Sequence, residues 1–409
     1  MPETTAAADM PESQLAPVQE NVEVAKKEMR AVLLTGFGGV KMLKTQSIPE
    51  VAPSEGEVAV RVKACGLNFL DLMVRQGVID NPPKTPITMG FECSGEVEAV
   101  GENTPGVAVG DRVIVLTDYK AWSEVVVVNA NFVYKMPDSL SFQDGAALAM
   151  NYLTAYIMLF DIGNLCKGKS VLLHSAGGGV GHAVCQLCRT QEEVTVFGTA
   201  SYHKHEAIKT MVTHLFDHVV DYGQEVRKLS PEGVDIVLDC LCGEDANKGI
   251  ALLKPLGKYI LYGSSNIVTG ETKSFFSFAK SWWQVDKISP IKLYDDNKSV
   301  AGFQLRQLLF RQGGATYVRN VMDRLFTMYK QGQIRPIVDS VWAFEDVGDA
   351  MTKLHDRKNI GKVLLDPSLQ PKTKETINVT VTMVTLQTSA DAAPAAEDTE
   401  KKECQNGDQ

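Results

Sequence analysis

Apolar and polar residues alternate along several short stretches in the first third of the chain. Val58, Val60 and Val62 give the clearest example, because this period of two places all three side chains on one face of a strand. Glycine, proline and asparagine separate the stretches. Many short strands with such punctuation are typical of a barrel-like β domain, and we expect strands at residues 29–34, 57–63, 95–101, 111–116 and 122–128.

The pattern changes near residue 141. Ser141 followed by Asp144 is a helix-capping combination, and helical apolar spacing continues to residue 160. Short apolar runs then alternate with helical segments, which is typical of a doubly wound parallel sheet of the α/β class. We expect its strands at residues 171–174, 194–198, 219–222, 234–239 and 259–263, and helices from 180, at 203–212 and at 245–253. A helix at 318–331 and strands at 340–344 and 362–365 would return the chain to the β domain.

The turn after the strand at 171–174 is rich in glycine. Backbone N–H groups at a helix start attract phosphate, and glycine lets the backbone approach a pyrophosphate closely. The spacing Ser175-x-x-Gly178-x-x-Gly181 departs from the standard G-x-G-x-x-G pattern, so a close packing point is the alternative interpretation. The turn predicts a dinucleotide site at Gly178, Gly179, Val180 and Gly181.

The residues after the next strand indicate which dinucleotide is bound. Proteins that bind NAD usually carry an acid there for the ribose 2′-hydroxyl, but this chain has Ser201 and Lys204. A hydroxyl and an ammonium group suit an additional 2′-phosphate, which a carboxylate would repel. The pair predicts NADPH as the cofactor, and a solvated loop lysine is the alternative interpretation of Lys204.

Length and charge limit the possible functions. A chain of 409 residues predicts two domains with tails. The net charge of −9 belongs mainly to the two ends, since residues 1–28 hold six acids and two bases, and residues 367–409 hold seven acids and four lysines. Both ends are poor in packed-core residues, and we expect them to be disordered. The remaining chain has no basic run, so we expect no nucleic-acid partner.

No window of 18 uninterrupted apolar residues occurs, and the acidic start does not resemble a secretory signal. We therefore expect no membrane span and a cytoplasmic location, with any association with vesicle or mitochondrial membranes being peripheral. Eight cysteines in a chain of this length fit free thiols in a reducing compartment.

The order of these parts resembles a known family, the medium-chain dehydrogenase/reductases, and within it the quinone oxidoreductase branch. The resemblance covers about residues 29–366, and its markers are residues 64–71, 90–95, 108–113, 151–156, the glycine turn and 361–364. Residues 36–39, 63–77 and 270–285 are similar to a narrower group in that branch, the vesicle amine transport protein homologs.

The resemblance implies a GroES-like β-barrel domain with an inserted Rossmann domain, and a cleft between them for nicotinamide and substrate. The expected divisions are a disordered leader at 1–28, the GroES-like domain at 29–152, the Rossmann domain at 153–300, a return at 301–366 and a disordered tail at 367–409. It also implies that Ser201, Lys204 and Tyr222 hold the 2′-phosphate, that Gly263 lies near the nicotinamide, and that the protein is a homodimer.

Two positions argue against the catalytic zinc ion of the wider superfamily. Zinc alcohol dehydrogenases keep a cysteine ligand where this chain has Asn68, and a histidine ligand where it has Phe91. Phenylalanine cannot ligate zinc, and Glu92 alone would hold it weakly. We therefore expect no metal.

The candidate catalytic residues are Asn68, Asp71 and Thr154. Reduction of a conjugated carbonyl needs a hydride and a donor for the developing oxyanion. Asn68 or Thr154 would donate a hydrogen bond, but neither is a good proton source. The alternative for Asp71 is a structural cap. Many quinone oxidoreductases have tyrosines where this chain has Met73 and Ile79.

These observations leave two hypotheses. The first is a zinc-independent, NADPH-dependent oxidoreductase that transfers hydride to a small quinone or enone in the interdomain cleft. The second is a catalytically weak NADPH-binding scaffold that acts through protein partners or peripherally at vesicle or mitochondrial membranes.

Overall fold

The computed structural model describes residues 27–268, 270 and 288–372 of the chain. The predictions for the two ends fall, apart from residues 27, 28 and 367–372, outside the described residues. Most of the 270–285 stretch also lies outside them.

Among the described residues, six parallel strands form one sheet in the order β11-β10-β9-β12-β13-β14. The strand order reverses between β9 and β12, and the carboxyl ends of strands at such a switch point are where open α/β sheets bind ligands. The strands are β9 (Ser170–Leu173), β10 (Thr195–Ala200), β11 (His214–Asp217), β12 (Val234–Asp239), β13 (Leu253–Leu261) and β14 (Ser299–Gly302).

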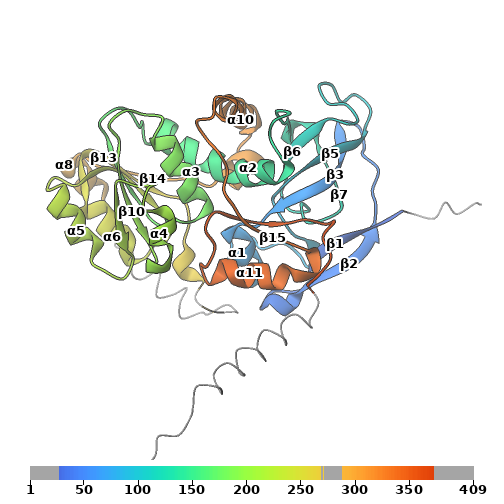
Figure 1. Cartoon of the computed structure of the whole chain (residues 1–409), viewed down its shortest axis with the longest axis horizontal. Helices are drawn as coiled ribbons and strands as arrows, with labels where there is room; N and C mark the ends of the chain where they lie inside the picture. Colours follow the sequence, from blue (N-terminus) through green and yellow to red (C-terminus); the bar gives the residue numbers. More distant parts are fainter. Residues whose placement is uncertain (1–26, 269, 271–287, 373–409) are drawn as a thin grey trace, which may run out of the picture.

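Helices flank this sheet in the left half of Figure 1. They are α3 (Gly179–Cys188), α4 (His205–Ile208), α5 (Tyr222–Leu229), α6 (Glu244–Ala251) and α8 (Pro290–Asp296). The strand expected at 219–222 is wrong, because Asp221 caps α5 by accepting a hydrogen bond from the Gln224 N–H, and Val219 and Val220 are exposed. The helix expected at 203–212 shrinks to a 3-10 turn at 202–204 and the single turn of α4.

The β domain occupies the right half of Figure 1. Within the described ranges, one sheet has the order β15-β16-β3-β5-β6-β8 with β7 also paired to β3, and a smaller sheet has the order β2-β1-β4. Its strands are β1 (Glu28–Leu34), β2 (Leu43–Pro49), β3 (Glu57–Gly66), β4 (Ile87–Thr88), β5 (Glu92–Val100), β6 (Arg112–Leu116), β7 (Val125–Asn129), β8 (Val133–Lys135), β15 (Val338–Trp342) and β16 (Lys362–Leu365). Two helices, α1 (Phe69–Gln76) and α11 (Val347–His355), pack together below it.

The helix α2 (Phe142–Tyr156) joins the two parts, and a π-helical turn at 157–162 extends it. It packs against α3 on one side and against β3, β5 and β6 on the other. Residues 142–162 are the one stretch of the described chain that is long and apolar enough to be a candidate membrane span, and 67% of that window is buried in the protein. The burial is that of a core helix.

The chain returns through α9 (Leu305–Arg311) and α10 (Ala315–Lys330). A single hydrophobic cluster contains Leu325 of α10 together with Tyr134 of β8, Leu153 of α2 and Leu173 of β9. The expected division at 300/301 falls inside β14, which belongs to the six-stranded sheet, and β15 is the first later strand of the β-domain sheet. The architecture is the predicted one, a β domain with an inserted doubly wound α/β domain.

Candidate active site

A cavity of about 1170 Å³ lies between the two domains. Its wall includes every site residue expected from the sequence except Asp71: Asn68, Thr154, Gly178, Gly179, Val180, Gly181, Ser201, Lys204, Tyr222 and Gly263. The cavity therefore brings together residues that are up to 195 positions apart in the chain.

The glycine turn links β9 to α3. Ser175 adopts a left-handed conformation with φ of 58°, and Gly178 is the extended residue that precedes the first turn of the helix. A Cβ at Gly179 would lie 2.5 Å from the Asn151 carboxamide, and a Cβ at Gly181 would collide with the Ala176 carbonyl oxygen. Close packing thus explains these two glycines, as the alternative interpretation held. A Cβ at Gly178 would lie 3.3 Å from its nearest neighbour, the Ser175 carbonyl oxygen. Close packing therefore requires a glycine less strictly at this position than at the other two.

The same turn presents the N-terminus of α3 to the cavity. The N–H groups of a first helical turn have no intrahelical acceptor, and the helix dipole favours an anion there. The Gly361 N–H donates a 3.1 Å hydrogen bond to the Gly177 oxygen, which ties the β-domain segment before β16 to the turn. The turn is therefore held from both domains.

Lys204 is buried, with 6% of its surface exposed. Its ammonium group donates a 2.6 Å hydrogen bond to the Asn359 carbonyl oxygen, and its aliphatic chain lies against Gly177. Burial lowers the pKa of Lys204 to about 8. The interpretation of Lys204 as a solvated loop residue is therefore wrong. Ser201, half-buried at the end of β10, lines the same part of the cavity.

Tyr222 lies nearby but is already hydrogen-bonded. Its hydroxyl donates to the Asp245 carboxylate at 2.9 Å, and its ring packs edge-on against His174. Burial lowers the pKa of His174, which keeps the imidazole neutral; its Nδ1 lies 3.1 Å from the Thr199 hydroxyl. A phosphate contact by Tyr222 would have to compete with the Asp245 bond.

The other end of the cavity holds a buried group of polar side chains. The Lys362 ammonium lies 2.5 Å from Glu92 Oε1 and 2.7 Å from Asn68 Oδ1. Asn68 Nδ2 donates to Glu92 Oε1 at 2.8 Å, and the Met150 N–H donates to Glu92 Oε2 at 2.7 Å. Lys362 is 3% exposed and Glu92 is fully buried. Each of these charges is thus compensated inside the wall of the cavity.

These residues do not fit a zinc ion. Phe91 is buried, with its ring against Tyr119 and the Arg306 guanidinium. Both Glu92 oxygens accept hydrogen bonds, and the Lys362 ammonium already supplies the positive charge beside them. Among the described residues, no group of three or more histidine, cysteine, aspartate or glutamate side chains is arranged to hold a metal.

Asp71 lies outside the cavity wall and is fully buried. Its Oδ2 accepts the Asn68 N–H at 2.8 Å, and the two residues form a capping box at the start of α1. Burial raises the pKa of Asp71 to about 8, although the bond from the Asn68 N–H opposes this shift. The catalytic assignment of Asp71 does not fit this placement, and the structural cap does.

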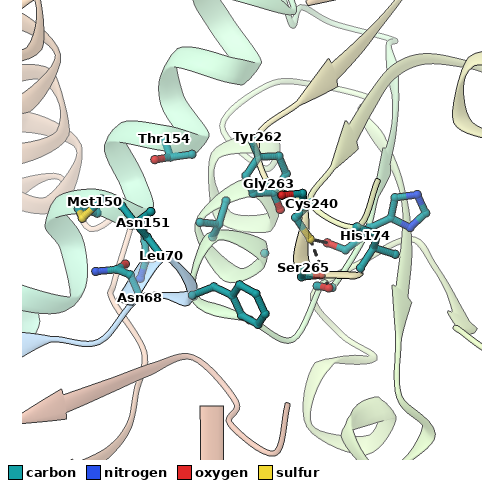
Figure 2. Close-up of a pocket in the computed structure, with 18 of the residues that line it drawn as sticks. Asn68, Leu70, Met150, Asn151, Thr154, His174, Cys240, Tyr262, Gly263 and Ser265 are labelled. Carbon is teal, nitrogen blue, oxygen red and sulfur yellow. Dashed lines mark hydrogen bonds between the residues drawn. The ribbon is translucent and has the colours of Figure 1, made fainter. Parts of the chain in front are cut away.

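Figure 2 shows how the middle of the cavity is arranged. Asn68, Met150 and Thr154 lie on one side, and Tyr262, Gly263 and Cys240 lie on the other. The Cys240 thiol is 3.5 Å from the Ser175 hydroxyl, and burial raises the pKa of Cys240. Gly263 follows β13, and a Cβ there would approach the Cys240 backbone at 3.3 Å.

Several wall residues were not expected from the sequence. They include His174, Cys240, Asn359 and Lys362. Lys362 belongs to the Gly361-Lys362 pair, which was a family marker, so the sequence contained that signal. Asn359 contacts Lys204 through its backbone oxygen. Every residue has such an oxygen, so the type of side chain gives no signal for this contact.

Two family models match the chain. Residues 54–138 match the alcohol dehydrogenase GroES-like domain, and residues 216–365 match the model described as zinc-binding dehydrogenase. The human synaptic vesicle membrane protein VAT-1 homolog-like is 62% identical over 347 residues, which cover 84% of this chain and 82% of the relative. A quinone oxidoreductase from Pongo abelii is 29% identical over 350 residues, 83% of this chain and 98% of the relative.

The chain belongs to the VAT-1 homolog-like group of the quinone oxidoreductase family, within the medium-chain dehydrogenase/reductases. This confirms both the predicted family and the predicted fold class, a GroES-like domain combined with a Rossmann domain.

Solved structures agree with this membership. The crystal structure of the human VAT-1 homolog-like protein has a TM-score of 0.75 and 55% identity, and the match covers 84% of this chain and 99% of that one. CurK enoyl reductase has a TM-score of 0.71 and 26% identity, covering 83% and 99%. Mycobacterial Rv1454c complexed with NADPH has a TM-score of 0.71 and 26% identity, covering 83% and 100%.

Proposed function

We propose that the protein is a zinc-independent, NADPH-dependent reductase of small quinones or enones. The observation that carries the proposal is the single cavity. It joins a glycine-rich turn of the dinucleotide-binding type, the Ser201 and Lys204 pair, and a region that carries the Asn68 amide and the Thr154 hydroxyl.

Two parts of the cavity wall support NADPH as the cofactor: the glycine turn before α3, and the Ser201 and Lys204 pair after β10. The first turn of α3 offers N–H groups to a pyrophosphate, and Gly178 leaves room for its approach. Lys204 and Ser201 stand where an NAD-binding chain would place an acid. The NADPH complex of the related mycobacterial structure supports the same choice. When bound, NADPH supplies a hydride.

The acceptor assignment rests on the chemistry of the pocket. Its walls carry apolar side chains, which suit a planar conjugated ring or chain, from Leu70, Met73, Met150, Ile157 and Phe303. A hydrogen bond from Asn68 would stabilise charge on the acceptor oxygen. One quinone, one NADPH and one proton from solvent give one hydroquinone and one NADP⁺, so the reaction needs no acidic side chain. The names of the quinone oxidoreductase and enoyl reductase relatives favour these two acceptor classes.

We propose that no zinc takes part, because the Lys362 ammonium already pairs with Glu92 and because Phe91 has no atom that could ligate zinc. The description of the matching family model as zinc-binding reflects the wider superfamily.

The test is NADPH oxidation by the purified protein with an ortho-quinone and, separately, with an enone. We expect turnover that depends on the acceptor and is unchanged after treatment with a zinc chelator. NADPH binding without oxidation by either acceptor would overturn the reductase and favour the scaffold hypothesis. Loss of turnover on chelation would contradict the zinc-independent mechanism alone.

A further inference from the structure

The amide of Asn68 has neighbours of fixed hydrogen-bonding character. An ammonium group can only donate, so the atom 2.7 Å from Lys362 Nζ must be the acceptor, Oδ1. The amide nitrogen then faces Glu92 Oε1, which accepts its hydrogen bond at 2.8 Å. The reversed amide would bring two donors together at Lys362 and two acceptors together at Glu92. The network therefore determines the orientation of Asn68.

The chain positions this network accurately. Lys362 begins β16, directly after Gly361, which is hydrogen-bonded to the cofactor turn. The Leu67 N–H donates to the Val363 carbonyl oxygen at 3.0 Å, so the residues before Asn68 and after Lys362 are also paired. On the other side, the Met150 N–H of α2 fixes Glu92 Oε2. Three segments of the chain thus hold the three side chains in place.

Resting on the proposed function, we propose that Lys362 is a positioning residue that orients the Asn68 amide as a hydrogen-bond donor to the acceptor's carbonyl oxygen. An amide nitrogen carries two N–H groups, and Glu92 uses one of them. Asn68 lines the cavity, and we assign its second N–H to a substrate oxygen. The site consequently selects acceptors with a carbonyl oxygen, and Asn68 is the residue that touches it.

A role in stability alone explains the buried ion pair of Lys362 and Glu92 less well than a role in orienting Asn68. Taking two charges out of water costs free energy that their attraction often only balances, so an apolar pair of similar volume would serve the fold as well. The ion pair instead gives the neighbouring amide one orientation. Since a misplaced donor costs a large part of its effect on the transition state, that orientation bears directly on rate.

A double-mutant cycle tests the proposal. We expect Asn68→Leu to lower kcat with a quinone about 100-fold, the scale of a lost oxyanion donor, and Lys362→Met to lower it about 10-fold or more. Because Lys362 acts through Asn68, the double variant should match Asn68→Leu within about twofold. NADPH affinity, measured by calorimetry, should stay within about threefold throughout. Independent multiplication of the two losses, or an unchanged kcat in Lys362→Met, would overturn the proposal.

Two further variants guard against a folding defect. Lys254→Met removes another partly buried lysine. The Lys254 ammonium lies 3.1 Å from the Asp235 carboxylate, and neither residue lines the cavity, so this variant should leave kcat unchanged. If Lys362→Met does not fold, Glu92→Gln combined with Lys362→Met removes both charges. In that protein the amide of Asn68 has no ammonium to fix it, so kcat should still fall; a wild-type kcat would contradict the proposal.

The cycle also separates this inference from the proposed function. If the wild-type protein oxidises NADPH but the cycle is additive, only the positioning role fails. If the wild-type protein oxidises no NADPH, the reductase fails, and the same four proteins are titrated with a quinone in the presence of NADP⁺. Weaker binding by Asn68→Leu and Lys362→Met, without additivity, would still support the oriented donor, and equal binding by all four would overturn it.

Discussion

The Lys204 ammonium donates a 2.6 Å hydrogen bond to the backbone oxygen of Asn359, a residue 155 positions further along the chain. The first belongs to the turn after β10 and the second to the segment that precedes β16. This contact places a partly desolvated positive charge at the edge of the cavity, and it connects the inserted α/β domain to the segment that leads into β16.

Replacing Lys204 by alanine should weaken NADPH binding at least about tenfold and change NADH binding little, because only NADPH carries the 2′-phosphate. Calorimetric titration with both dinucleotides measures this. Lys209→Ala is the matched control, since Lys209 is an exposed neighbour paired with Glu206, and it should bind both as the wild type does. Equal losses for NADPH and NADH in the Lys204 variant would contradict the 2′-phosphate contact.

NADPH binding should take up protons near pH 8.5. Burial lowers the pKa of Lys204 to about 8 in the free protein, so much of it is neutral at that pH, and a bound phosphate would raise this pKa again. Affinity for NADPH should therefore fall relative to NADH as the pH rises through 8. Calorimetry in two buffers of different ionisation enthalpy detects the uptake. Equal proton uptake with NADH would show that another group is responsible.

The same shift predicts a change in stability with pH. The unfolded lysine has a pKa near 10.5 and the folded one near 8, so between these values the unfolded chain holds more protons. The contribution of Lys204 to the free energy of unfolding should accordingly rise with pH over this window. In Lys204→Met this contribution should be absent, as measured by denaturant unfolding at pH 8 and pH 10.

Gly178→Ala should separate phosphate binding from packing. A Cβ at this position would lie 3.3 Å from the Ser175 oxygen, and the backbone φ of −83° is one that alanine adopts, so the free energy of unfolding should stay within about 1 kcal/mol of the wild-type value. NADPH and NADH should both bind more weakly, because the methyl group stands where the pyrophosphate approaches the backbone. Unchanged affinity for both dinucleotides would contradict the phosphate-binding role of Gly178, and a large fall in Tm would show that the position is required for packing.

Asp71 should prove to be a cap and not a catalyst. Asp71→Asn keeps an acceptor for the Asn68 N–H and resembles the protonated acid that a pKa of about 8 favours at neutral pH. It should retain kcat within about twofold. Asp71→Ala removes the cap and should cost about 1 kcal/mol of stability. A large fall in kcat for the asparagine variant, with the fold intact, would restore the catalytic assignment.

The periodicity of the sequence predicted the fold well, because the core strands and helices bury one regular face. The error at residues 219–222 has a clear cause. Val219 and Val220 are β-branched, as strand residues often are, but they are exposed in a turn, and Asp221 begins α5 by capping it. The strand propensity of the two valines did not decide their structure, because they lie in the short connection between β11 and α5.

Local patterns in the sequence indicated part of the site, and the family resemblance indicated further wall residues such as Asn68 and Gly263. The glycine turn and the Ser201 and Lys204 pair are contiguous signals, and they lie on the cavity wall. The Lys204 ammonium donates its hydrogen bond to Asn359, and the partner of the buried Glu92 carboxylate is Lys362, 270 positions later in the chain. Such long-range pairs have no pattern in a single sequence, so the polar network around Asn68 became visible only in the structure.

In the proposed reaction, hydride passes from NADPH to an acceptor in this cavity. The most direct test uses NADPH carrying deuterium at the transferred position and an enone acceptor, with the product examined by mass spectrometry. The account predicts one deuterium on carbon in the reduced enone, with a slower rate than for unlabelled NADPH if hydride transfer limits turnover. NADPH that binds at the turn while its label never reaches the enone or any reduced product would contradict the account.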